Sequence, residues 1–247
     1  MDSGDTDADA SAAPVRAQVL DAVPHGFFGQ TPRGDIGTAQ EDREADRRRA
    51  ADALAPERVL LAARQVHSNQ AVIATQPWSV ADSPQADAVV TTLPDVLVGV
   101  VTADCAPVLL ADIEAGVVAA AHAGWRGALG GIVEASVAAM ERCGASPSRI
   151  AAAIGPTIAQ SSYEVDDAFR DRFGAQDDAF FAPGRAGHWQ FDLEGYVAQR
   201  LRDAGVGRVQ KLGVDTYANP DRYHSYRRAT HRGGDTIGRQ FSVIGLP

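Results

Sequence analysis

Residues 96–127 read VLVGVVTADCAPVLLADIEAGVVAAAHAGWRG, and this stretch decides the fold. It contains three apolar runs, at 96–101, 107–111 and 117–121, which are separated by short polar segments. The runs consist mostly of Val, Leu and Ala without a clean alternation with polar residues, and this pattern favours strands that are covered on both faces. We therefore expect three buried strands here.

Outside this stretch, short apolar runs continue on both sides, and one segment changes to helical spacing. Ile132, Val133, Val137 and Met140 recur at that spacing, and Gly144 is the expected stop. Strand pairs mixed with single helices predict an α+β domain with a mixed sheet. Further strands are expected at 59–63, 71–74, 88–91, 150–154, 209–214 and 241–244, and helices at 128–142, 163–173 and 193–204.

Two charged or polar regions complete the predicted organisation. Residues 1–14 are rich in Asp, Ala and Ser, which predicts a disordered leader. Residues 41–55 form the densest charge run and predict a solvated helix. No fixed-period repeat or long linker interrupts the rest, so residues 15–247 are expected to form a single domain.

The composition narrows the function classes. The 247 residues include 23 basic and 32 acidic side chains, a net charge of −9, which disfavours nucleic acid and anionic membranes as partners. No apolar run is long enough for a membrane span, and the N-terminus lacks the pattern of a secretory signal. Two cysteines without a CxxC indicate a reducing, cytoplasmic location. No dinucleotide or P-loop motif occurs.

Two histidines and one cysteine stand at the ends of predicted strands. His67 follows one apolar run, Cys105 lies in a polar break between two others, and His122 ends a fourth. Two imidazoles and a thiolate suit zinc and leave a fourth coordination position open, which is the arrangement of a catalytic site. The same residues allow two other interpretations. Cys105 could be a nucleophile with either histidine as its base, or the three could hold a copper ion.

Counting ligands argues against multicopper chemistry. A multicopper oxidase needs several more histidines, commonly as His-x-His pairs. The chain has six histidines and no such pair, so only four remain beyond His67 and His122. Copper is therefore disfavoured as the metal.

Two segments are candidate anion sites. AHAGWRG at 121–127 joins a predicted strand to a helix, so that free N–H groups and Arg126 could bind phosphate; a plain turn with a packed tryptophan is the alternative. The stretch 217–240 interleaves tyrosines with arginines that could stack on a base and clamp phosphate. Lysine occurs once among the 23 basic residues, so a solvated surface is an equal alternative for Arg222, Arg232 and Arg239.

Several motifs occur together in a recognisable order. They are RQVH at 64–67, TADCAPVLLAD at 102–112, AHAGWRG at 121–127, IGP at 154–156, YEV at 163–165, YRR at 226–228 and GRQ at 238–240. In this order they resemble the laccase-domain family, long labelled multicopper polyphenol oxidase and now understood as zinc-dependent purine nucleoside phosphorylases. The resemblance runs from about His25 to Leu246, nearly the whole chain.

The resemblance implies a fold similar to the catalytic domain of a cysteine-dependent bacterial toxin. It implies one zinc ion held by His67, Cys105 and His122. It also implies phosphorolysis of adenosine, inosine, guanosine and S-methyl-5′-thioadenosine, with adenosine deamination as a side activity. The family usually has cysteines near Gly155-Pro156, before Tyr163 and before the Thr-Tyr pair at 216–217. This chain has Thr157, then Ser161 and Ser162, and then Asp215 at those places.

The expected site has further members, and two other function classes stay open. Asp104 and Arg126 are the candidate catalytic residues, with Asp104 either a proton carrier or a partner of one of the two histidines. The partners expected are purine nucleosides and phosphate, bound to a monomer. The alternatives are a cysteine hydrolase that uses Cys105 and a non-enzymatic, zinc-stabilised binding module. The candidate substrate-binding residues are Arg64, Tyr226, Arg227 and Arg228.

Overall fold

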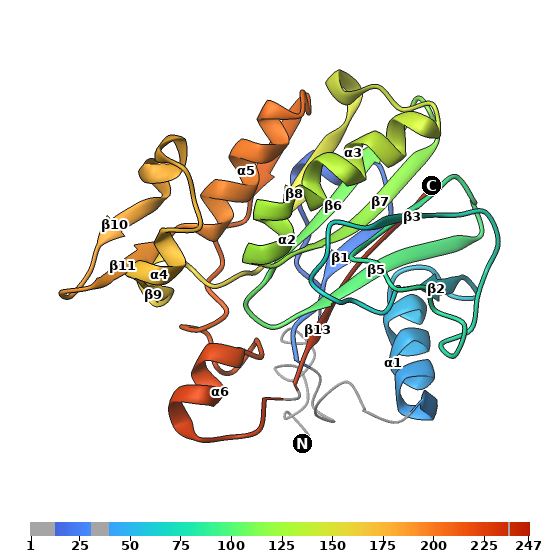
Figure 1. Cartoon of the computed structure of the whole chain (residues 1–247). Helices are drawn as coiled ribbons and strands as arrows, with labels where there is room; N and C mark the ends of the chain where they lie inside the picture. Colours follow the sequence, from blue (N-terminus) through green and yellow to red (C-terminus); the bar gives the residue numbers. More distant parts are fainter. Residues whose placement is uncertain (1–12, 31–39, 237) are drawn as a thin grey trace, which may run out of the picture.

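The apolar runs of the sequence become the strands of two packed sheets (Figure 1). The computed structural model of the chain describes residues 13–30, 40–236 and 238–247. The predicted leader at 1–14 therefore lies almost wholly outside the described residues. No helix in the described ranges is both long and apolar enough to cross a membrane.

The larger sheet has six strands in the order β12-β8-β6-β7-β4-β3. Its outer pairs, β3 with β4 and β8 with β12, are parallel, and the three inner pairs are antiparallel. The sheet is therefore mixed, as predicted. Its strands are β3 (Ala71–Ala74), β4 (Ala88–Thr91), β6 (Ala106–Asp112), β7 (Val117–Ala123), β8 (Ala151–Ile154) and β12 (Arg208–Lys211).

The smaller main sheet has four strands in the order β1-β13-β5-β2. Here β2 runs parallel to β5, while β13 is antiparallel to both of its neighbours. The last strand in the sequence therefore lies in the interior of this sheet. Its members are β1 (His25–Phe27), β2 (Val59–Leu61), β5 (Val96–Thr102) and β13 (Gln240–Gly245).

The two sheets pack face to face, and helices cover both outer faces. Along β5, Val96, Val98 and Val100 point into the core between the sheets, whereas Leu97 packs in a cluster on the outer face with the end of α1 (Gln40–Asp52). The outer face of the six-stranded sheet packs against α3 (Ile132–Arg142) and α5 (Leu193–Asp203). Both faces of the central strands are therefore buried, which explains why their sequences lack polar alternation.

Shorter elements complete the chain. A three-stranded antiparallel sheet, β10-β11-β9, lies to one side of the main sheets (Figure 1). It comprises β9 (Glu164–Asp166), β10 (Phe181–Pro183) and β11 (His188–Phe191). The short helices are α2 (Trp125–Gly130), α4 (Asp167–Arg170) and α6 (Tyr226–Arg232), and the 3₁₀ turns are Gln18–Leu20, Pro147–Arg149, Gln160–Ser162 and Ala175–Phe180.

The structure confirms a mixed-sheet, single-domain architecture and corrects several elements. The predicted helix at 163–173 is wrong: residues 164–166 pair with β11, and Asp166 then caps the four-residue helix α4 by accepting from the amide of Phe169. The helix expected at 128–142 is divided by Gly131, whose φ of +94° ends α2. The strand expected at 209–214 spans 208–211. The likeness to the toxin fold stays a prediction.

Candidate metal centre

His67, Cys105 and His122 converge although they are far apart in the sequence. Their ligand atoms all lie within 4.8 Å of one another, and the two imidazole rings are nearly perpendicular, at 83°. His122 is buried, Cys105 is half-buried and His67 is exposed. One face of the cluster is therefore open to an incoming molecule, as a catalytic metal site requires. The group could hold a metal ion.

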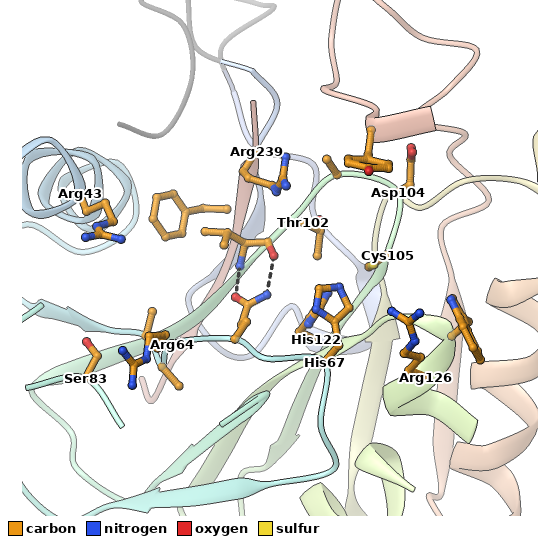
Figure 2. A pocket seen from close by; sticks show the side chains of 18 of the residues that line it. Arg43, Arg64, His67, Ser83, Thr102, Asp104, Cys105, His122, Arg126 and Arg239 are labelled. Carbon is orange, nitrogen blue, oxygen red and sulfur yellow. Dashed lines mark hydrogen bonds between the residues drawn. The ribbon is translucent and has the colours of Figure 1, made fainter. Parts of the chain in front are cut away.

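The topology explains why these three side chains meet. His67 lies in the segment that leads from β2 to β3, and Cys105 lies in the turn from β5 to β6. Both segments cross from the four-stranded sheet to the six-stranded sheet, and each brings one ligand to the same end of the strands. His122 lies near the end of β7, directly opposite Pro107 in the neighbouring strand β6. Figure 2 shows the three side chains close together.

Two residues at the crossings adopt left-handed backbone conformations. His67 has φ +58° and Asp104, next to Cys105, has φ +84°. Such a conformation costs a non-glycine residue about 1–3 kcal/mol. Hydrogen bonds offset this cost: the Asp104 carbonyl accepts from the hydroxyl of Thr157 at 2.6 Å and from the amide of Ile158 at 3.0 Å. The turn that presents Cys105 is thus held by hydrogen bonds from Thr157 and Ile158, which follow β8.

Asp87, which the sequence analysis did not single out, organises the centre. Its fully buried carboxylate accepts from His122 Nδ1 at 2.8 Å and from the amide of His67 at 3.0 Å. It also accepts from the amide and the hydroxyl of Ser68 at 2.6 and 2.8 Å. Because a carboxylate only accepts, His122 Nδ1 carries a proton, and Nε2 is the nitrogen that would bind a metal.

The charges of the cluster favour a thiolate beside a protonated imidazole, and a bound metal would displace the Nε2 proton of His122. Burial alone would raise the pKa of the Cys105 thiol, but His122 and His67 outweigh it and lower the pKa to about 6. Burial alone would lower the pKa of His122, but Cys105 and Asp87 outweigh it and raise the pKa to about 9. Hydrogen bonds from His122 and Ser68 likewise overcome burial and hold the pKa of Asp87 well below its usual range. The thiolate is therefore available near neutral pH.

Gly124 leaves the space that an ion needs. A Cβ at this position would lie 2.9 Å from Cys105 Sγ, 3.2 Å from His67 Cδ2 and 3.7 Å from His122 Nε2. The backbone of Gly124 has ordinary extended angles, so the requirement for glycine is one of space alone. The thiolate, two imidazoles and this gap fit a small, borderline-soft cation.

Asp104 is not a partner of the metal-site histidines. One carboxylate oxygen accepts from the hydroxyl of Thr216 at 2.6 Å, and the other accepts from the amide of Arg227 at 2.7 Å. Asp87 takes the histidine instead, because the register of β4 and β7 places it beside His122. Asp104 therefore fastens the start of α6 to the edge of the cavity.

We name His67, Cys105 and His122 the metal cluster, because together they could hold an ion. The metal cluster lines a cavity of about 1040 Å³. Arg64, Asp104, Arg126, Tyr226 and Arg227 also line it, so the structure brings together most of the predicted site. Figure 2 shows Arg126 on one side of the histidines and Arg64 on the other.

Arg228, which was predicted to bind substrate, lies apart from the other predicted residues. Its guanidinium donates to the backbone carbonyls of Thr216, Tyr217 and Tyr223, and it does not line the cavity that holds the metal cluster. It acts as a backbone tether. Arg239, for which the sequence left a solvated surface open, does line this cavity.

The AHAGWRG segment packs as a plain turn and also places Arg126 at the cavity, where phosphate binding stays a prediction. Trp125 is half-buried and packs on the main core cluster, as in a plain turn. Arg126 is exposed, lines the cavity and has its guanidinium carbon 4.8 Å from the centre of the Trp125 ring. The turn is thus a packed junction that also presents a cation.

Thr157, Ser162 and Asp215, three positions where the resemblance led us to expect cysteines, lie in one hydrogen-bonded cluster. Thr157 and Asp215 are bridge partners, and Ser162 Oγ donates to Asp215 Oδ2 at 2.6 Å. Asp215 also accepts from the amides of Ala159 and Tyr217. Hydrogen bonding holds these loops together without thiols.

The fold and the site define a mixed α/β protein with a His–Cys–His group at the junction of two sheets. Residues 33–247 match the family model described as multi-copper polyphenol oxidoreductase laccase, and the chain belongs to this family.

Named relatives and solved structures agree with this membership. The chain is 39% identical over 245 residues to a purine nucleoside phosphorylase of Deinococcus radiodurans, which covers 92% of this chain and 90% of that protein. It is 40% identical over 176 residues to one of Rickettsia conorii, covering 70% and 72%. The crystal structure of YlmD from Geobacillus stearothermophilus superposes with a TM-score of 0.81 at 26% identity, covering 95% and 99%.

Proposed function

We propose that this protein is a zinc-dependent purine nucleoside phosphorylase of the cytoplasm that acts as a monomer. Its substrates would be adenosine, inosine, guanosine and S-methyl-5′-thioadenosine, with adenosine deamination as a side activity. The relatives that are named purine nucleoside phosphorylases support the reaction class. The observation that carries the proposal is the convergence of His67, Cys105 and His122 on one wall of an arginine-lined cavity.

The proposed reaction is displacement at the ribose. A phosphate oxygen attacks C1′, the bond from C1′ to N9 of the purine breaks, and the electron pair leaves with the purine, which takes up a proton. Zinc held by His67, Cys105 and His122 would supply Lewis-acid stabilisation of developing negative charge. Because three protein ligands leave a fourth position open, the centre can accept a substrate atom or water.

The arginines and Asp104 have separate proposed roles. Arg126 and Arg227 line the cavity with the metal group, so their guanidinium groups are placed to hold phosphate. Arg64 and Tyr226 line the same cavity and are proposed to bind the nucleoside. Asp104 borders Cys105 and lines the cavity, and we propose it as the proton carrier.

The test measures the release of adenine and ribose 1-phosphate from adenosine and phosphate by chromatography. His122→Ala and His67→Ala are expected to lose at least about a hundredfold in rate, since removing even an outer partner of a metal ligand typically costs 10–100-fold. The exposed His67 keeps the test informative should the buried His122 variant misfold. His231→Ala, an exposed histidine of α6, is the matched control. Undiminished release by folded ligand variants would remove the metal from the mechanism.

A second candidate is a cysteine hydrolase. It is favoured by the placement of Cys105 Sγ within 4.8 Å of nitrogen atoms of both His67 and His122. A strong chelator separates the two candidates, because a thiol enzyme keeps its activity and a zinc enzyme loses it. A binding module would show chelator-sensitive melting but no nucleoside turnover.

A further inference from the structure

The cavity is larger than the proposed chemistry needs. Ligand sites for drug-sized molecules span about 300–1,000 Å³, and this cavity reaches about 1040 Å³. A nucleoside beside the metal cluster leaves part of it unfilled. That remaining part extends to the start of α1 and to the segment before β4, where Arg43 and Ser83 line it.

The cavity is positively charged although the chain is acidic. Six arginines line it, whereas Asp104 is the one carboxylate among its described lining residues. Both oxygens of Asp104 already accept hydrogen bonds. No described carboxylate forms an ion pair with any of the six arginines. Low-dielectric walls focus such a field and attract anions. The six are Arg43, Arg47, Arg64, Arg126, Arg227 and Arg239.

Two of these arginines lie on the side of the metal cluster opposite Arg126. We name Arg43 and Arg64 the distal arginines. Figure 2 shows them with Ser83 on that side, whereas Arg239 lies above the histidines. Arg43 comes from α1 and Arg64 from the segment after β2, while the guanidinium of Arg239 donates to the carbonyls of Thr236 and Gly238. Two separate elements thus deliver cations to one side of the cavity.

Hydrogen bonds from Arg47 hold this region in place. Arg47 donates to the carbonyl of Ala62 at 2.9 Å and to Ser83 Oγ at 3.2 Å, which fastens α1 over the cavity. Arg43 lies one helical turn before Arg47, where two like charges repel. Burial, and then the charge of Arg43, lower the pKa of Arg47. The backbone of Arg64 is fixed by a bridge to Gln85, while its side chain is exposed.

We propose that the distal arginines form a second anion subsite that binds a phosphate group. The group is either the 5′-phosphate of a purine nucleotide whose base and sugar lie toward the metal cluster, or free phosphate. Guanidinium groups match the oxygens of a phosphate through charged, bidentate hydrogen bonds, and Arg43 and Arg64 bring two of them to this side of the cavity. The purine part of the ligand rests on the proposed function, whereas the phosphate subsite rests on the arginines alone.

Calorimetric binding measurements test the subsite with three probes: adenosine, adenosine 5′-monophosphate and inorganic phosphate. The variants are Arg43→Gln and Arg64→Gln, both exposed side chains whose loss should not impair folding. Arg48→Gln is the matched control, since Arg48 is exposed on the same helix and does not line the cavity. We expect the wild type and the control to bind the monophosphate roughly tenfold or more tightly than adenosine, because charged hydrogen bonds contribute that much.

Each outcome bears on the subsite. If Arg43→Gln abolishes the tighter binding of the monophosphate relative to adenosine and leaves adenosine binding unchanged, the subsite holds a 5′-phosphate. If only the binding of inorganic phosphate falls, the subsite holds the free ion. If neither phosphate probe responds to Arg43→Gln or Arg64→Gln, the subsite is refuted. Adenine release measured on the same samples is independent, so a failure of the proposed phosphorolysis would be seen separately.

Discussion

Replacing Asp87 with asparagine should release the metal without unfolding the chain. Asp87 Oδ1 accepts from His122 Nδ1 and from the amide of His67, and Oδ2 accepts from Ser68 and from the amide of Val66. Asparagine has one acceptor oxygen, so its NH₂ group must face one of these two sets of donors. At least two buried or half-buried donors then lose their acceptor.

Either orientation of the new amide carries a cost whose size follows from the donor count. Each unsatisfied buried donor costs about 1–3 kcal/mol, so the free energy of unfolding should fall by about 2 kcal/mol or more. His122 can avoid the mismatch by moving its proton to Nε2, and it then accepts from the amide through Nδ1. That tautomer cannot bind a metal through Nε2. We therefore expect metal affinity to fall by about 10–100-fold.

The assay is metal content after equilibration with a competing chelator, measured by mass spectrometry on protein whose circular dichroism matches the wild type. Asp112→Asn is the matched control. Asp112 is equally buried and accepts from the amide of Ser146 at 2.9 Å, but it lies outside the cavity lining. This control should lose stability and keep its metal. Folded Asp87→Asn with wild-type metal affinity would refute the positioning role of Asp87.

Three further outcomes are expected. Gly124→Ala should lower metal content with little loss of stability, because its Cβ would lie 2.9 Å from Cys105 Sγ; Gly130→Ala, whose Cβ would meet nothing closer than 4.0 Å, should keep the metal. Asp112 has its pKa lowered because hydrogen bonds, first from Arg149, outweigh burial. The stability that Asp112 contributes is present above its unfolded pKa of 3.8 and is lost as pH falls through the lower folded value. Asp112→Asn should therefore be less stable than the wild type at pH 7 and equally stable in strong acid. Denaturant titrations at the two pH values measure this difference. Chelation should lower the melting temperature reversibly, since an ion present at a thousand times its dissociation constant stabilises by about 4 kcal/mol; unchanged melting of metal-loaded protein would contradict this.

Local sequence patterns predicted the central strands because those strands have a strong local signature. The runs at 96–101, 107–111 and 117–121 became β5, β6 and β7 with nearly the same bounds. The convergence of Cys105 and His122 could be proposed because both follow or interrupt such runs. The prediction of a helix at 163–173 was wrong because the aromatic residues there do not line one face of a helix. Phe169 lies in α4 and Phe173 in the turn after it, and both pack on Phe191 of β11.

Long-range pairing produced what the sequence could not show. Asp87 lies 19–35 residues from its donors, and only the register of β4 with β7 places it beside His122. The short helix α6 was missed because it has no run of apolar residues at helical spacing, although Ser225 offered a local signal and caps it by accepting from the amide of Arg228. The role of Arg43 depends on how α1 docks, which charge density alone does not specify.

The two sheet crossings give any bound ion a mechanical role. His67 and Cys105 stand where the chain passes from one sheet to the other, and both cysteines of the protein are free. An ion held there would act as a reversible cross-link between the sheets, in place of a disulfide bond. Its free energy would be shared by β5 and β7, which belong to different sheets. Metal binding should therefore slow amide hydrogen exchange in both sheets, so that occupancy of the centre can be measured at amides far from the cavity.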